Sequence, residues 1–187
     1  MFIPCHWLAP DMLYLSMGIG WCALTSIELA RILRISPLAE PINRFMIPFI
    51  DYHDSGYAIL SHLYLIVGCA IPIWLRTSHP IANLAGILTL GLGDAAASIV
   101  GQSAWGRHHW PGSRKTVEGT VAFTLSVLIV TGVLSLSPTF QASAGPSGAS
   151  WFIMSTTITA IGEALTDQND NLYIPLILVI LLNLRPL

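Results

Sequence analysis

Apolar residues recur in six stretches of the chain, separated by segments rich in charged and turn-forming residues. The stretches cover roughly residues 12–27, 57–75, 81–100, 121–136, 150–165 and 172–184. A helix that spans a bilayer needs about 20 apolar residues, with a lower limit near 17, so several stretches are short. Gly, Pro, Ser and Thr within them suit close helix packing or local unwinding where they face protein. The pattern predicts an all-α fold, a polytopic integral membrane bundle of about six transmembrane helices in a single domain, 1–187.

The composition favours a membrane protein over a soluble one. Hydrophobic residues make up 53% of the chain, charged residues 10%, and the mean hydropathy is +0.67. Soluble domains carry about 25% charged residues, so an unusually apolar soluble core is the weaker alternative. The net charge of -2 gives no general polybasic character and predicts no nucleic-acid partner.

The charges gather at one face when the connecting loops are assigned to alternate sides of the membrane. Six of the eight Lys and Arg fall on the side that holds the loops after the first, third and fifth stretches. The positive-inside rule makes that side cytoplasmic. Nine of the ten Asp and Glu lie on or near the same side, which orientation alone does not explain. A shared cytoplasmic site explains it, and solvated loop acids are the alternative.

Two segments without long apolar runs differ in character. Residues 137–150 contain Pro, Gly, Ser and Ala but no charge, and predict a flexible loop on the far side. Residues 101–120 are crowded with Gly, His and basic residues. In that segment, backbone amides near Gly112, the charges of Arg114 and Lys115, and the Thr116 hydroxyl are typical ingredients of a phosphate site. Neither a Walker A loop nor a dinucleotide-binding fingerprint is matched. A basic loop that only touches anionic lipid headgroups is the alternative.

Carboxylates inside apolar stretches are the other candidates for chemistry. Asp94 follows two glycines and precedes small residues, and an acid within a membrane is costly unless it is paired or binds a metal. We expect a Mg²⁺ ligand or a base for a hydroxyl proton, with an ion pair to Arg107 or Arg114 as the alternative. Glu163 and Asp170 share a helical face and repel each other unless a cation neutralises them. A solvated helix end is the alternative there.

Several motifs carry a family resemblance. They are Gly-Leu-Gly-Asp at 91–94, Trp-Pro-Gly-Ser-Arg-Lys-Thr at 110–116, Glu-Gly-Thr at 118–120 and Gln-Asn-Asp-Asn at 168–171, followed by Pro175. On these motifs the chain resembles the dolichol kinases of the CTP-dependent polyprenol kinase family, from about residue 28 to its end. Members usually have more spans at the N-terminus, so the chain is expected to be the C-terminal catalytic part of a longer polyprenol kinase.

The resemblance implies a multi-pass enzyme of the endoplasmic reticulum membrane. Such an enzyme moves the γ-phosphoryl group of CTP to the terminal hydroxyl of dolichol, giving dolichyl phosphate and CDP for protein glycosylation. The implied partners are CTP, dolichol or another polyprenol, Mg²⁺ or another divalent cation, and membrane lipids. The CTP-binding segment would correspond to about 109–124 and face the cytoplasm, with 137–150 lumenal. Alternatives are a CTP-dependent phytol or diacylglycerol kinase, a cytidylyltransferase, a transporter or a structural membrane subunit. No oligomeric state is predicted.

The expected roles follow from the residue chemistry and the resemblance together. Lys115, Arg114 and amides near Gly112 would hold the CTP phosphates, as positioning and charge neutralisation dominate phosphoryl transfer. The expected catalytic residues are Asp94, Lys115 and Asp54. The expected metal ligands are Asp94, Glu118, Glu163 and Asp170. The expected nucleotide-binding residues are Arg107, His109, Trp110, Pro111, Gly112, Ser113, Arg114, Lys115, Thr116, Glu118, Gly119 and Thr120.

Overall fold

Helices are the regular secondary structure in the part of the chain that is described. The computed structural model describes residues 8–37, 39–46, 58–77, 79–103, 108–136, 146–166 and 170–184. Every regular element in these ranges is a helix, which confirms the all-α prediction. The elements are α2 (Pro10–Ile32), α3 (Ala39–Met46), α4 (Ser61–Leu75), α5 (Pro80–Asn83), the π-helical η2 (Ile87–Asp94), α6 (Ala95–Gly101), α7 (Val117–Leu134), α9 (Pro146–Leu165) and α10 (Asp170–Asn183).

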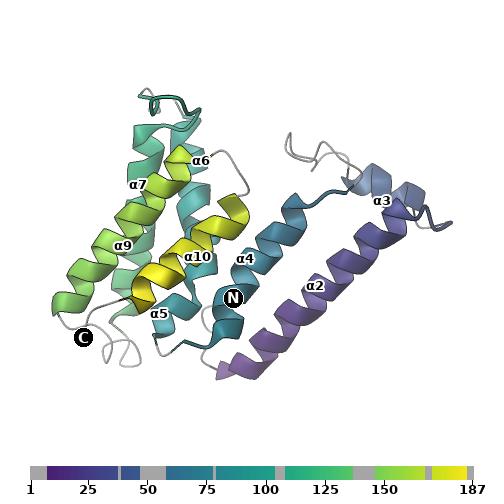
Figure 1. Ribbon diagram of the computed structural model, residues 1–187, viewed down its shortest axis with the longest axis horizontal. Coiled ribbons are helices and arrows are strands. Elements are labelled where there is room, and N and C mark those ends of the chain that lie inside the picture. Colours follow the sequence, from purple (N-terminus) through teal and green to yellow (C-terminus); the bar gives the residue numbers. More distant parts are fainter. Residues whose placement is uncertain are drawn as a thin grey trace.

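The helices pack side by side in an order that differs from the chain order. Helix α4 lies between α2 and α10, and α10 packs on α9. Helix α9 packs on α7, which contacts α6 and η2. Figure 1 shows α2 and α3 on one side of the molecule and α6, α7 and α9 on the other. The largest buried cluster joins η2, α7, α9 and α10 around Phe123, which is fully buried.

Each predicted span overlaps a helix, but six transmembrane helices are not confirmed. By length and composition, α2 and α7 are the two helices in the described ranges that could cross a membrane. Helix α4, the joined helix 87–101 and α10 are apolar but shorter. The third predicted span is divided into α5, η2 and α6, because Pro80 starts a short helix that ends at Asn83.

Helix α7 shows apolar side chains on opposite faces. Phe123 and Val127 are buried in the core, whereas Leu125 and Ile129 on the outer face are 52% and 64% exposed. In water such a row of exposed large apolar residues along a whole helix is unfavourable, and in lipid it is expected. With the two long apolar helices, this outer face indicates a membrane protein.

Two predicted loops are shorter than expected. The prediction of a flexible loop over 137–150 is wrong for its last residues, because α9 begins at Pro146, and proline is favourable in the first helical turn. Residues 137–145 lie outside the described ranges. The predicted loop over 101–120 likewise ends early, because Thr116 caps α7 and residues 117–120 form its first turn. Helix α3 is an element that the apolar pattern does not predict.

Ion pairs mark the two ends of α2. At its start, Asp11 Oδ1 accepts a hydrogen bond of 2.6 Å from Arg76 Nη2 at the end of α4. Near its other end, buried Glu28 accepts two hydrogen bonds from Arg31, at 2.6 and 2.9 Å. Glu28 also accepts the backbone N–H of Ile59 at 2.6 Å, so it ties α2 to the segment before α4.

Candidate active site

Residues 108–116 form a tight hairpin between α6 and α7. The Trp110 N–H donates to the Lys115 carbonyl at 3.0 Å, and the Ser113 N–H donates to the Trp110 carbonyl at 3.1 Å. Gly112 has φ +77, and a proline precedes it, which is the residue pattern of a type II turn. A Cβ at Gly112 would meet no other atom, so the left-handed backbone is what requires glycine. The turn fixes the direction in which the Lys115 side chain leaves the hairpin.

Small residues let the hairpin and α7 sit directly against α6. The Thr116 hydroxyl accepts the Gly119 N–H at 3.1 Å and so caps the start of α7. A Cβ on Gly119 would lie 3.0 Å from both the Ala97 carbonyl oxygen and the Thr116 hydroxyl oxygen. A Cβ on Gly101 would lie 2.9 Å from the same hydroxyl. The Gly-rich character of 101–120 therefore serves close helix packing.

Two side-chain contacts clamp the hairpin onto α7. The Trp110 indole Nε1 donates to Thr120 Oγ1 at 2.9 Å. Glu118 accepts the His108 backbone N–H at 3.2 and 3.3 Å and contacts His108 Nδ1 at 2.6 Å. Both contacts join the hairpin to the first turn of α7. Trp110 and Glu118 therefore stabilise the position of the hairpin.

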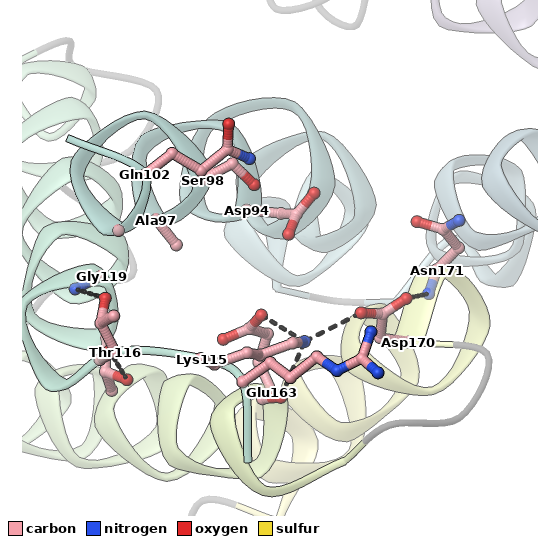
Figure 2. Close-up of a pocket in the computed structure, with 13 residues that line it drawn as sticks. Asp94, Ala97, Ser98, Gln102, Lys115, Thr116, Gly119, Glu163, Asp170 and Asn171 are labelled. Atoms are coloured by element: carbon pink, nitrogen blue, oxygen red, sulfur yellow. Dashed lines mark hydrogen bonds and ion pairs between the residues drawn. The ribbon is translucent and has the colours of Figure 1, made fainter. Parts of the chain in front are cut away.

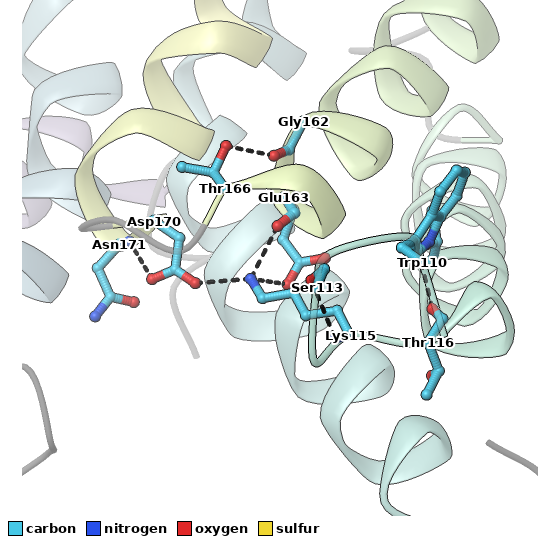
Figure 3. A network of polar contacts seen from close by, with 10 residues as sticks. Trp110, Ser113, Lys115, Thr116, Gly162, Glu163, Thr166, Asp170 and Asn171 are labelled. Atoms are coloured by element: carbon cyan, nitrogen blue, oxygen red, sulfur yellow. Dashed lines mark hydrogen bonds and ion pairs between the residues drawn. The ribbon is translucent and has the colours of Figure 1, made fainter. Parts of the chain in front are cut away.

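Lys115 reaches from the hairpin to α9 and α10 (Figure 3). Its Nζ lies 2.5 Å from Glu163 Oε1, 2.9 Å from the Glu163 carbonyl oxygen and 2.9 Å from Asp170 Oδ2. These three acceptors match the three protons of an ammonium group. Burial disfavours the charged ammonium, but hydrogen bonds and charges from Glu163 and Asp170 outweigh it, so the pKa of Lys115 lies above its ordinary value. Lys115 is a charged link between three elements.

A polar cavity of about 480 Å³ lies beside this link. Figure 2 shows Asp94, Ser98 and Gln102 on one wall, facing Lys115, Glu163 and Asp170 on the other. The three residues of the first wall are four positions apart, so they share one face of the η2–α6 helix. The full lining is Asp94, Ala97, Ser98, Gly101, Gln102, Arg114, Lys115, Thr116, Gly119, Thr120, Glu163, Asp170 and Asn171.

The cavity lining carries the positive and the negative side chains that a phosphoryl-transfer site needs. Arg114 and Lys115 are cationic, and the first turns of α7 and α10 border the cavity. Helix N-termini and basic side chains favour a bound polyphosphate. Three carboxylates line the same space and suit a divalent cation or a substrate hydroxyl. In the described ranges, no group of three or more His, Cys, Asp or Glu is close enough to hold a metal ion by itself.

The structure brings together many of the predicted site residues. Those that line the cavity are Asp94, Arg114, Lys115, Thr116, Gly119, Thr120, Glu163 and Asp170. Those that do not are His109, Trp110, Pro111, Gly112, Ser113 and Glu118. Asp54 and Arg107 lie outside the described residues.

The cavity also contains residues that the site prediction omits. Gln102 and Asn171 line it, as does Ser98, one of the small residues that follow Asp94. Continuing the four-residue spacing from Asp94 through Ser98 to Gln102 is the signal that finds this wall. Asn171 follows Asp170 at the start of α10, so its sequence position next to a predicted ligand is the signal there.

The chain is similar over nearly its whole length to named dolichol kinases. It is 40% identical to dolichol kinase EVAN of Arabidopsis thaliana over 188 residues, which cover 97% of the chain and 32% of that protein. It is 37% identical to dolichol kinase sec59 of Schizosaccharomyces pombe, covering 97% of the chain and 36% of that protein. It is 33% identical to the dolichol kinase of Homo sapiens, covering 91% of the chain and 33% of that protein.

The chain belongs to the dolichol kinase family. This confirms the resemblance carried by the motifs, and the chain spans about a third of the length of these dolichol kinases. A phytol kinase of Synechocystis is also similar, at 40% identity over 58% of the chain and 42% of that protein. No protein-family model matches, and no solved structure matches significantly.

Proposed function

We propose that this chain carries out CTP-dependent phosphorylation of dolichol, giving dolichyl phosphate and CDP. The observation that carries the proposal is the cavity that Arg114 and Lys115 line, in which Lys115 faces a wall bearing Asp94. The family membership supports a phosphotransferase with a polyprenol acceptor. The choice of CTP as donor rests on the motif resemblance at 110–120.

The basic side of the cavity suits the triphosphate. Arg114, Lys115 and the first turn of α7 would bind the phosphate oxygens, with Thr116 and Thr120 on the same helix turn. In the present arrangement all three Lys115 protons have acceptors on Glu163 and Asp170. To bind a phosphate oxygen, Lys115 must therefore exchange at least one of these acceptors for it.

The carboxylates fit a Mg²⁺ ion that is held together with the nucleotide. Mg²⁺ is usually bound by one or two carboxylates plus substrate phosphates, and Asp94, Glu163 and Asp170 are the candidates because all three line the cavity. Bound there, the ion would neutralise charge on the phosphates. Glu118 is the weakest of the predicted ligands, since its carboxylate contacts His108 and lies outside the cavity lining.

Asp94 is our candidate for orienting the acceptor hydroxyl. Glu163 and Asp170 are both ion-paired with Lys115, whereas Asp94 stands on the facing wall. A carboxylate within hydrogen-bond reach of a hydroxyl can align it and accept its proton. Asp94 could serve here or as a metal ligand, and both roles predict loss of transfer when its charge is removed.

We further propose a multi-pass placement in the endoplasmic reticulum membrane with the 101–120 segment in the cytoplasm. The asymmetry of Lys and Arg supports this orientation. It also gives the hairpin access to a soluble nucleotide, while the acceptor arrives from the bilayer.

The proposal is tested by phosphate transfer from CTP in membranes that contain this chain. CTP labelled at the γ-phosphate should give labelled dolichyl phosphate, whereas CTP labelled at the α-phosphate should give no labelled lipid. A lipid labelled from the α-phosphate would indicate a cytidylyltransferase instead. The similarity to a phytol kinase makes phytol the second acceptor to test. Transfer to phytol in preference to dolichol would mean that phytol is the acceptor. No transfer to either lipid would contradict the proposal.

A further inference from the structure

The C-terminal cap of helix α2 changes the direction of the chain. Arg34 has φ 52, in the left-handed region that non-glycine residues rarely adopt. The Ile35 N–H donates to the Ala30 carbonyl at 3.0 Å, and the Arg34 N–H donates to the Arg31 carbonyl at 3.2 Å. These bonds and the left-handed residue form a Schellman motif, which stops the helix and redirects the chain. Helix α3 follows beyond this turn (Figure 1).

The short helix α3 separates apolar and polar residues cleanly. At 100° per residue, Ile42, Phe45 and Met46 fall on one side of the helix, and Glu40 and Arg44 fall on the other. None of the described α3 residues is buried. A helix of eight residues is too short to be stable by itself in water and needs a surface for its apolar side.

The protein supplies only part of that surface. Asn43 Oδ1 accepts a long hydrogen bond of 3.4 Å from Arg31 Nη1, so the polar side of α3 is tied to the end of α2. On the apolar side, Phe45 is 69% exposed. The nearby end of α2 and the turn also expose apolar residues, with Leu33 at 62% and Ile35 at 46%. Exposed apolar residues therefore occur at the end of a candidate membrane span, in the turn after it and on α3, which packs against α2.

We propose that α3 lies in the interface of the lipid bilayer, with Phe45 inserted at the boundary between headgroups and acyl chains. An amphipathic helix binds there when its apolar side enters this boundary and its cationic side chains meet anionic headgroups. Arg34 in the turn before α3 and Arg44 on its polar side provide the positive charge. The contact of α3 with the end of α2, a candidate membrane span that itself exposes apolar residues, selects lipid rather than a protein partner as the occupant.

The position of α3 has a consequence for the candidate site, which rests on the proposed function. Figure 1 shows α3 and the hairpin before α7 at the same end of the helices. A helix fixed in the interface holds the cavity near the depth of the headgroups, where the hydroxyl of a membrane lipid resides. Helix α3 thereby sets the depth at which the acceptor meets the nucleotide.

Spin-label accessibility tests the location of α3 without relying on activity. The full chain, with its native cysteines replaced by alanine, is reconstituted in phosphatidylcholine nanodiscs with single cysteines at Phe45, Glu40 or Ile129. A nitroxide at each position is exposed to oxygen, which concentrates in lipid, and to a water-soluble nickel complex. We expect the Phe45 label to be accessible to oxygen and poorly accessible to nickel, like the Ile129 reference on α7, and the Glu40 label to be accessible to nickel.

Two results would overturn the proposal. Nickel access at Phe45 equal to that at Glu40 would put α3 in water, and shielding from both reagents would mean that protein covers it. Activity provides a separate readout, in which Phe45→Ser raises the KM for the lipid acceptor roughly tenfold without changing the KM for nucleotide, and Phe45→Trp restores it. If the wild-type chain transfers no phosphate, the proposed function fails while the label result still decides the position of α3.

Discussion

Replacement of Lys115 by methionine should destabilise the protein as well as impair its site. The substitution removes the charge that neutralises Glu163, whose side chain is 5% exposed, and Asp170, which is 34% exposed. Loss of one partner from a buried pair costs about 3–5 kcal/mol, and an exposed pair contributes about 0–1 kcal/mol. Because only the Glu163 contact is buried, we expect a loss near 3 kcal/mol in the free energy of unfolding.

The assay is reversible unfolding of the purified chain in mixed detergent micelles, followed by far-ultraviolet circular dichroism. The control is Arg114→Met, because Arg114 is the neighbouring cation but is exposed, and its loss should change stability by less than about 0.5 kcal/mol. Adding Glu163→Gln to Lys115→Met should recover part of the loss, since the uncompensated charge disappears. If Lys115→Met unfolds like the wild type and the double variant behaves no differently, the link between the hairpin, α9 and α10 is not structural.

Three further results are expected. Trp110→Phe should cost about 1 kcal/mol of unfolding free energy, because it removes the hydrogen bond from the indole to Thr120. Thr120→Val should cost more, because it also removes the bond from the Thr120 hydroxyl to the Thr116 carbonyl, and the double variant should cost about the same as Thr120→Val alone. Additive losses in this double-mutant cycle would contradict the shared bond. The pKa of Lys115 is raised in the folded protein, so its contribution to stability is complete below pH 10.5 and is lost only as the pH rises through the raised value. The free energy of unfolding, measured against alkaline pH, should therefore show a decline that Lys115→Met lacks. Gly68→Ala should destabilise the protein by about 1–3 kcal/mol, because a Cβ there would lie 2.0 Å from a backbone oxygen of α10. A Cβ at Gly132 has open space, so Gly132→Ala should stabilise the protein by about 0.5–1 kcal/mol. Equal shifts in thermal unfolding for the two variants would refute the close approach of α4 and α10.

The positions of the long helices are predictable from the apolar pattern, and their interruptions are not. Every predicted stretch overlaps a helix because buried and lipid-facing residues are both apolar. The pattern does not distinguish a continuous span from one that is divided near Asn83, where a four-residue helix ends. It also misses α3, because Pro41 and the polar residues of that segment resemble a loop when its environment is unknown.

The candidate site is predictable in its charges and less so in its orientation. Asp94, Lys115, Glu163 and Asp170 are conspicuous as charges near apolar stretches, and all line one cavity. Residue types along a loop do not reveal which side chains turn inward. The type II turn decides this for the hairpin, and it turns Trp110 toward α7 instead of the cavity.

Lys115 illustrates a further limit of the sequence. A lysine in a loop at the membrane surface predicts a phosphate ligand whose loss spares folding. Its contacts with α9 and α10 depend on residues 48 and 55 positions away, which no local pattern reveals. A loss of activity in a Lys115 variant therefore combines two effects. A test of the site needs a carboxylate outside this ion-pair network.

The most direct test of the cavity as the site of phosphoryl transfer compares Asp94→Asn with Asp11→Asn. The chemical change is the same, but Asp94 lines the cavity, whereas Asp11 forms an exposed ion pair with Arg76 at the far end of α2. The measurement is the rate of γ-labelled phosphate transfer from CTP to dolichol in membranes with equal amounts of each protein. We predict a loss of about 100-fold or more for Asp94→Asn and a near-normal rate for Asp11→Asn. Equal rates for the two variants would contradict a catalytic role for this cavity.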